Sequence, residues 1–293
     1  MADLVKKDLF SLEWFARSSF AGIDAAMHNR PTVSRHEQSL IRNLVLNLLD
    51  AEKAEADFRL SPMLSFYAFC QPLVRRSYAQ ILQDLWVLYM LGLRRGGYFV
   101  EFGACDGRTL SNTRLLEESY GWTGILAEPN PVWHEALATN RKAVVDLRCV
   151  AARSGEMADF LSTDAMPELS RMADIVPDDV HEHNGNRTRQ TLYKVPTVSL
   201  DDLLAEHGAP DIIDYLSVDT EGSEYEILRH TNLNRRRFRL ISVEHAGETV
   251  KRDQIFTLLE AAGYRRWMPE LSRWDDWYVH QDDLGRAEPT LAH

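Results

Sequence analysis

Apolar positions follow two different patterns along the chain, and the change comes near Arg95. Before it, apolar side chains recur at the three- and four-residue intervals of amphipathic helices. After it, short apolar runs alternate with helix-period segments, which predicts an α/β fold with a doubly wound, mainly parallel sheet. We therefore expect an N-terminal helical region over 1–76, a sheet domain over 77–284 and a loose C-terminal tail over 285–293.

The apolar runs that follow this change define the expected strands, and the segments between them define the expected helices. The strands are Tyr98–Phe102, Thr123–Glu128, Ala143–Cys149, Ile212–Asp219, Leu240–Glu244, Tyr264–Met268 and Asp276–His280. The helices are Ser111–Tyr120, Pro131–Asn140, Leu200–His207, Glu224–Arg229 and Arg252–Ala262, with further helices over Ser34–Phe58 and Ser77–Leu93. Only a short link that contains Pro269 joins the last two strands, so we expect an antiparallel hairpin at the sheet edge.

The segment from Thr163 to Lys194 interrupts the alternation of strands and helices. Its length and its polar composition suit an insertion rather than part of the core. Because loops above ligand sites often carry specificity, a substrate lid is the preferred interpretation, and a plain surface excursion is the open alternative.

Composition and charge limit the class of protein. A hydrophobic content of 45% and a charged content of 26% are ordinary for a globular protein. The net charge of −11 argues against a nucleic-acid partner bound through its phosphates. Three cysteines without paired spacing fit neither a disulfide framework nor a zinc site. With no signal peptide and no membrane-spanning run in the sequence, we expect a cytoplasmic protein.

The first strand ends in a glycine-bracketed turn, Gly103-Ala104-Cys105-Asp106-Gly107. A strand, such a turn and a helix that begins near Ser111 or Asn112 present backbone N–H groups to a ligand. The spacing is G-x-x-x-G rather than the G-x-G-x-x-G of dinucleotide sites. It suits a nucleoside with a cationic amino-acid part and no phosphate, a description that fits S-adenosylmethionine (SAM). Glu101 is the candidate partner of the amino group, and Asp106 has turn capping as its structural alternative.

The next two strands also end in candidate ligand contacts, because ligands bind beyond the carboxyl ends of the strands in an open parallel sheet. Glu128 follows at a spacing from which a carboxylate accepts hydrogen bonds from both ribose hydroxyls. Pro129 fixes the turn after it. Val150 and Ala151 end the third strand and offer a small apolar surface to an adenine.

Asp219, Glu244 and His245 end the fourth and fifth strands, which are neighbours in such a sheet. They are candidates for gripping a substrate or for removing a hydroxyl proton. Asp219 and Glu244 are also candidate ligands of Mg²⁺ or another divalent cation, because hard cations prefer carboxylate oxygens. A structural, hydrogen-bonded role is the alternative for His245, and helix capping is the alternative for Glu221 and Glu224.

Four ordered motifs resemble those of the FkbM family of SAM-dependent methyltransferases. They are Phe99-Val100-Glu101-Phe102-Gly103-Ala104-Cys105-Asp106-Gly107, Glu128-Pro129-Asn130-Pro131, Val195-Pro196-Thr197-Val198-Ser199-Leu200-Asp201-Asp202-Leu203-Leu204 and Asp219-Thr220-Glu221-Gly222-Ser223-Glu224. The resemblance covers about Ser77 to His280. One departure is Cys105, where relatives more usually have Asn.

This resemblance implies a Rossmann-like class I methyltransferase sheet and O-methylation of a hydroxyl on a sugar, a glycan or a natural product. The cofactor-binding set that we expect is Gln80, Glu101, Phe102, Gly103, Ala104, Asp106, Gly107, Ser111, Asn112, Glu128, Pro129, Val150, Ala151 and Asp219. The alternative is a catalytically silent SAM-binding scaffold that acts through its N-terminal helices, and a homodimer through those helices is a further expectation. A nicotinamide dehydrogenase is disfavoured by the missing glycine motif.

Overall fold

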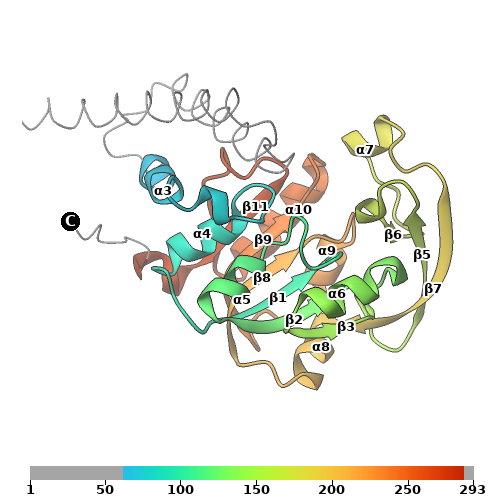
Figure 1. Ribbon diagram of the computed structural model, residues 1–293, viewed down its shortest axis with the longest axis horizontal. Helices are drawn as coiled ribbons and strands as arrows, with labels where there is room; N and C mark the ends of the chain where they lie inside the picture. The colour runs from blue at the N-terminus through green and yellow to red at the C-terminus, as the bar shows by residue number, and fades with distance from the viewer. Residues whose placement is uncertain (1–61, 287–293) are drawn as a thin grey trace, which may run out of the picture. The chain divides into compact units, whose positions relative to one another are not determined.

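A computed structural model describes residues 62–286, all of which lie in one compact unit of the chain, 57–293. The helices expected between Leu4 and residue 61, including Ser34–Phe58, and the end of the expected tail, 287–293, lie outside the described residues. Figure 1 shows a central sheet with helices packed around it. Among the described residues, no helix is both long and apolar enough to cross a lipid bilayer.

The central sheet has seven strands in the order β10-β11-β9-β8-β1-β2-β3. They are β1 (Tyr98–Phe102), β2 (Thr123–Ala127), β3 (Val144–Asp146), β8 (Ile212–Val218), β9 (Arg237–Glu244), β10 (Tyr264–Trp267) and β11 (Asp275–His280). β11 pairs antiparallel with both of its neighbours, and the other neighbouring strands pair parallel. The prediction of a doubly wound class I sheet with a terminal hairpin is therefore confirmed.

Helices pack on both faces of this sheet. They are α3 (Pro62–Cys70), α4 (Gln83–Met90), α5 (Arg114–Tyr120), α6 (His134–Asn140), α8 (Leu200–Glu206), α9 (Glu224–Arg229) and α10 (Thr249–Ala261), with the 3-10 turns η1 (Val74–Arg76), η2 (Pro131–Trp133) and η4 (Gln281–Arg286). Buried residues of α8, α9 and α10 join those of β1, β8 and β9 in one apolar cluster. On α4, Trp86 stacks on Trp277 at 5.1 Å between ring centroids. These contacts anchor the strands whose ends form the site.

A second, four-stranded sheet was not predicted. It has the order β4-β7-β5-β6 and consists of β4 (Cys149–Ala151), β5 (Met157–Thr163), β6 (Arg171–Met172) and β7 (Gln190–Ser199). The insertion lies between β5 and β7, which pair antiparallel, and it contributes η3 (Pro167–Leu169), β6 and α7 (Val180–His183). Figure 1 shows β5, β6, β7 and α7 gathered at one side of the main sheet.

The single strand expected over Ala143–Cys149 is wrong. The chain forms β3 and β4 there, which belong to two different sheets. Between them, the Asp146 carboxylate accepts the backbone N–H of Arg148 at 3.0 Å and pairs with its guanidinium at 2.6 Å. This local turn redirects the chain, so an apolar run that looks continuous in sequence is split.

Two helices begin later than expected because buried carboxylates bind the residues before them. Asp84 accepts hydrogen bonds from the Ser77 hydroxyl at 2.6 Å and from the Tyr78 N–H at 2.9 Å, and α4 begins only after Leu82, which has a φ of +70°. Glu101 binds the residues before α5 in the same way, as described below.

Candidate functional site

A cavity of about 410 Å³ opens beyond the carboxyl ends of β1, β2, β8 and β9. Its walls include most of the predicted site residues: Gln80, Glu101, Phe102, Gly103, Ala104, Asp106, Ser111, Asn112, Glu128, Pro129, Val150, Asp219 and Glu244. Gly107, Ala151 and His245 are not among them. The structure therefore brings together the cofactor and carboxylate candidates from separate strands and leaves three candidates outside.

Gly103 lets the end of β1 approach the end of β8. It has a φ of +70°, and a Cβ at this position would lie 2.0 Å from the carbonyl oxygen of Asp219. Its N–H donates to the carbonyl of Ala127 on β2 at 3.1 Å. Gly107 acts away from the cavity, because a Cβ there would meet Leu137 and Arg141, each at 2.6 Å. One glycine shapes the cavity floor and the other serves helix packing.

Glu101 is buried and already has several hydrogen-bond partners. Its carboxylate accepts the Asn112 N–H at 2.8 Å and hydroxyl donors from Ser111 and Thr113, and it lies 3.5 Å from the Arg141 guanidinium. These bonds hold the segment between the glycine turn and α5 in a non-helical form. Glu101 thus borders the cavity while it shapes the chain around it.

Asp106 caps the turn in which it lies. Its carboxylate accepts the backbone N–H groups of Arg108 at 2.8 Å and Thr109 at 2.7 Å. This is the structural alternative that the sequence left open for it.

Glu128 connects the first two strand ends. Only 4% exposed, it accepts the Cys105 N–H at 2.8 Å and the Asn130 N–H at 2.7 Å, one on each carboxylate oxygen. Burial raises the pKa of Glu128 to about 7, against the lowering effect of these two N–H donors. Each oxygen retains a lone pair that a ligand hydroxyl can use.

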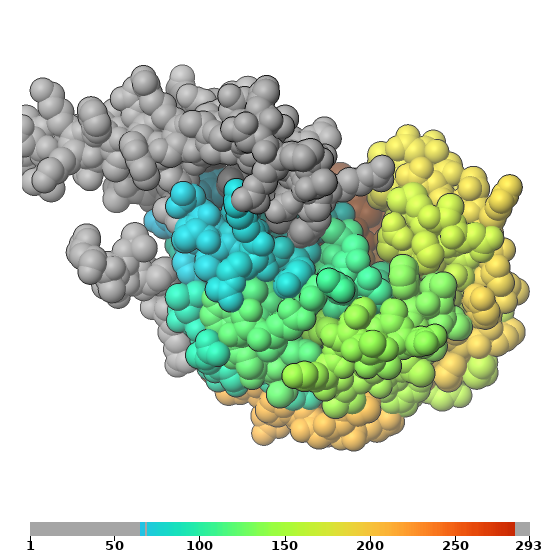
Figure 2. Space-filling view, viewed as in Figure 1, coloured from blue at the N-terminus to red at the C-terminus, as the bar shows by residue number. Residues whose placement is uncertain are grey.

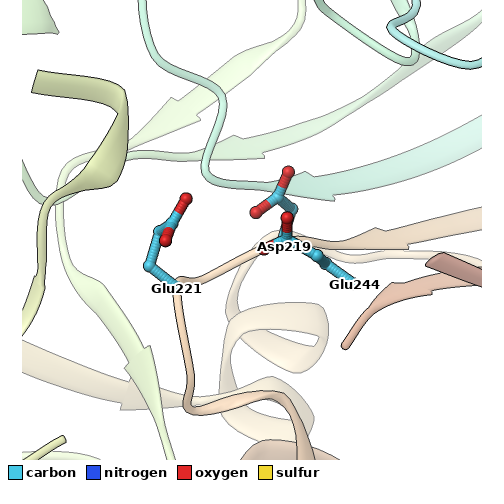
Figure 3. Close-up of side chains that lie close together, drawn as sticks. All are labelled: Asp219, Glu221 and Glu244. Carbon is cyan, nitrogen blue, oxygen red and sulfur yellow. The ribbon is translucent and has the colours of Figure 1, made fainter. Parts of the chain in front are cut away.

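Asp219, Glu221 and Glu244 bring carboxylate oxygens within 4.8 Å of one another. Figure 3 shows Asp219 and Glu221 on the loop after β8 and Glu244 beside them. Burial raises the pKa of Asp219 to about 6 and that of Glu221 to about 8, and it raises the pKa of Glu244 well above its ordinary value. Asp219 and Glu244 also share a hydrogen bond, so this pair holds a proton at neutral pH.

Glu224 organises the loop that carries two of these carboxylates. Its Oε1 accepts the N–H groups of Thr220 at 2.9 Å and Gly222 at 3.0 Å, and its Oε2 lies 3.4 Å from the Lys251 Nζ. Helix capping was the alternative expected for Glu224, but these N–H groups lie in the loop before α9, so Glu224 braces the loop rather than capping the helix. Glu221, by contrast, lines the cavity.

His245 is buried beside the cavity rather than in its wall. Its Nδ1 accepts the Gly247 N–H at 3.0 Å, so its Nε2 carries the proton and donates to the Asp275 carbonyl at 3.1 Å. Burial lowers the pKa of His245. With both ring nitrogens engaged by the backbone, His245 is not placed to take a proton from an acceptor, and the structural alternative fits its contacts.

The cavity also has walls for which the sequence contained little signal. These residues are Gln83, Trp133, Phe160, Met166, Pro167, Glu168, Leu169, Ser170, Met172, His181 and Glu221. Several belong to the insertion, which Figure 2 shows in yellow-green and yellow beside the green segments that follow β1 and β2. Only the polarity and length of the insertion indicated that its residues could line the cavity.

Comparison with known proteins gives a family match. Residues 101–266, more than half of the 293-residue chain, match the family described as methyltransferase FkbM domain. No curated protein matches the chain.

Solved structures similar to this chain share little sequence with it. One is a precorrin-6y C5,15-methyltransferase from Geobacter metallireducens GS-15, at 13% identity over 64% of this chain and 73% of that chain, with a TM-score of 0.33. A METTL16 MTase domain has 15% identity over 67% and 64%, with a TM-score of 0.36. A human methyltransferase 10 domain containing protein has 13% identity over 78% and 99%, with a TM-score of 0.37.

Proposed function

The chain belongs to the methyltransferase FkbM domain family of SAM-dependent methyltransferases, and from this premise we propose that it methylates the hydroxyl group of a sugar, a glycan or a natural product. The observation that carries the proposal is the group of carboxylates Asp219, Glu221 and Glu244 in the cavity that the glycine turn and Glu128 also line. The proposed nucleoside site and these carboxylates would thus share one cavity.

The residues present suit SAM at the β1 and β2 side of this cavity. Glu128 keeps free lone pairs for the ribose hydroxyls, and Val150 offers an apolar surface to the adenine. Asn112 is 7% exposed, and its amide oxygen has no hydrogen-bond partner among the described residues. An ammonium group such as that of the methionine part would satisfy this buried acceptor.

When bound, SAM supplies an electrophilic methyl group on its sulfonium sulfur. Transfer of that methyl group to a hydroxyl would release the hydroxyl proton, which a residue of this chain would have to accept. Asp219, with a pKa of about 6, is largely ionised at neutral pH and takes that proton. Glu244 keeps Asp219 oriented through their shared hydrogen bond. The cavity walls align the acceptor and exclude water.

A divalent cation is a second way to activate the hydroxyl at the same place. Asp219, Glu221 and Glu244 present oxygen ligands of the kind that Mg²⁺ prefers. A metal there would replace the protons that the group holds at neutral pH and would lower the pKa of the acceptor hydroxyl.

The free state of Cys70, Cys105 and Cys149 supports the proposed cytoplasmic location.

The test is methyl transfer from tritium-labelled SAM to a panel of hydroxylated sugars, glycans and natural products, with and without EDTA. Asp219→Asn should lower turnover by about 10²–10⁴-fold, because it removes the proton acceptor. The variant should bind S-adenosylhomocysteine within about threefold of the wild-type affinity, a change of less than 1 kcal/mol. Asp253→Asn, on the exposed face of α10, is the matched control.

Three outcomes would separate the alternatives. Transfer to amines but to no hydroxyl would contradict O-methylation, and unchanged turnover in Asp219→Asn would remove its role as the base. Binding of S-adenosylhomocysteine without transfer to any acceptor would favour the silent scaffold. Loss of transfer in EDTA and recovery with Mg²⁺ would assign the carboxylates to a metal.

A further inference from the structure

The side chain of Arg187 joins the insertion to the loop after β8. Its guanidinium donates to both oxygens of Asp179, each at 2.7 Å, and to Oε2 of Glu221 at 2.6 Å. Its Nε donates to the carbonyl of Leu169 at 3.3 Å. All three nitrogen atoms therefore have an acceptor, and the side chain is only 2% exposed.

Each partner of Arg187 belongs to a different part of the cavity wall. Leu169 lies in η3 and lines the cavity. Asp179 caps α7 by accepting the Glu182 N–H at 2.8 Å, and α7 carries His181, another lining residue. Glu221 is one of the three carboxylates at the strand ends. One guanidinium thus holds together two pieces of the insertion and the acidic loop.

The backbone of the same loop packs closely against the insertion. Gly222 has a φ of +125°, and a Cβ at this position would lie 2.4 Å from Cγ2 of Ile175. No side chain fits between the two segments without a shift. The ion pairs of Arg187 are therefore reinforced by a packed contact directly beside Glu221.

A plain surface excursion would not need a buried cation. Exposed pairs such as Lys194 with Asp159, whose side chains are 63% and 46% exposed, contribute little to stability. Burying Arg187 between Asp179 and Glu221 has a desolvation cost that only the ion pair with Asp179 and well-formed hydrogen bonds to both residues offset. This buried contact lies where the insertion meets Glu221, a carboxylate of the cavity.

We propose that Arg187 is a positioning residue that completes the acceptor half of the cavity. Its guanidinium fixes the orientation of the Glu221 carboxyl group, and it holds η3 and α7 as a wall opposite Asp219 and Glu244. The term acceptor half rests on the proposed function, but the coupling between the wall and Glu221 does not. Without Arg187, the wall and the carboxylate would lose their common anchor.

The test compares Arg187→Met and Arg187→Lys in the full chain, with Arg189→Met as the matched control at an exposed position of the same insertion. Glutamate labelled with ¹³C at its carboxyl carbon reports the mobility of the Glu221 carboxylate at one fixed pH, through the NMR relaxation of a signal that is identified by its loss in Glu221→Gln. Hydrogen exchange measured by mass spectrometry reports the amides of 165–187 and 219–223.

In Arg187→Met, the Glu221 carboxylate should become more mobile, with a relaxation rate changed by about twofold or more, because the guanidinium that orients it has been removed. Exchange should accelerate by about tenfold in both segments together, since local opening becomes easier. Arg187→Lys should restore part of both effects, because it keeps the charge and loses the planar fork. Arg189→Met should change neither.

An unchanged Glu221 relaxation rate in Arg187→Met, or faster exchange confined to the insertion, would show that Arg187 does not position the carboxylate and would overturn the proposal. If Arg187→Met does not fold, Asp179→Asn serves instead, because it loosens α7 and leaves the contact of Arg187 with Glu221. Its Glu221 relaxation rate should not change, and a change would also overturn the proposal. None of these measurements uses methyl transfer, so they stay interpretable if O-methylation fails.

Discussion

The two halves of the cavity are built in different ways. On the β1 and β2 side, backbone groups make the shape: Gly103 permits close approach to the end of β8, and the Cys105 N–H fixes Glu128. On the other side, charged side chains from distant segments make the shape of the cavity. Arg187 and Glu221, for example, are 34 positions apart in sequence. The first half follows from the sheet topology, whereas the second depends on individual ion pairs. Substitutions in each half should therefore fail in different ways.

The largest effect is expected from Gly103→Ala. The new Cβ would lie 2.0 Å from a carbonyl oxygen of Asp219, in a backbone conformation with a φ of +70° that side chains rarely adopt. Overpacking and left-handed strain together should lower the free energy of unfolding by about 3 kcal/mol or more. Urea denaturation followed by circular dichroism measures this loss.

Gly208→Ala is the control for the strain alone. Gly208 has a φ of +62° and open space around the position of a Cβ, so it should lose only about 1 kcal/mol. Similar losses in the two variants would show that the approach of β1 to β8 tolerates a side chain. The backbone account of this half would then be wrong.

The β1 and β2 side of the cavity was also the side that the sequence predicted best. The bounds of β1 were predicted as Tyr98–Phe102 and agree with the structure, because a buried apolar strand before a glycine turn is a local pattern. The place of Glu128 beside that turn follows from parallel pairing of β1 with β2. Local pattern and sheet topology were sufficient there.

The other half depends on information that local patterns do not contain. β5 and β7 pair across the insertion, so their partner residues lie far apart in sequence. Arg187 stands in a polar segment and looks like a surface residue until its burial with Asp179 is known. His245 follows a strand end, as a catalytic residue would, but backbone groups occupy both of its ring nitrogens. Only the tertiary contacts distinguish these roles.

An intermediate effect is expected from Glu128→Gln. Both Glu128 oxygens accept backbone N–H groups, so the amide NH₂ of glutamine would face one of these donors and could not accept its hydrogen bond. The variant would also lose hydrogen bonds that we propose for the ribose hydroxyls. Affinity for S-adenosylhomocysteine should fall by about 10–100-fold, or roughly 1.4–2.8 kcal/mol. Glu135→Gln on the exposed side of α6 is the matched control. Isothermal titration calorimetry of both variants measures the difference.

Wild-type binding should also depend on pH through the same carboxylate. With a pKa of about 7, Glu128 is mostly protonated at pH 6 and mostly ionised at pH 8. Because ribose hydroxyls donate to the ionised form, affinity should rise by about tenfold over this range. Unliganded stability should change in the opposite direction: the folded-state pKa is raised above the ordinary 4.5, so stability falls as pH rises from about 4.5 through 7. A pH-independent affinity would exclude Glu128 as the ribose ligand.

The smallest effect is expected from Cys105→Asn, and it separates backbone from side-chain contributions in the cofactor half, the β1 and β2 side of the cavity where we propose that SAM binds. Cys105 has a φ of +48°, a conformation in which Asn is several times more frequent than most residues. Its link to Glu128 is the backbone N–H, which the substitution keeps. Asn should therefore leave S-adenosylhomocysteine affinity within about twofold and change the free energy of unfolding by less than about 1 kcal/mol.

Cys105→Val is the informative contrast, because a β-branched residue at a positive φ is strained by about 1–3 kcal/mol. It should lower the thermal midpoint while retaining binding to the fraction that stays folded. If Cys105→Asn weakens binding tenfold, the Cys105 side chain itself contacts the cofactor. In that case the cofactor half, like the acceptor half, depends on an individual side chain, and the difference between the two halves would disappear at this turn.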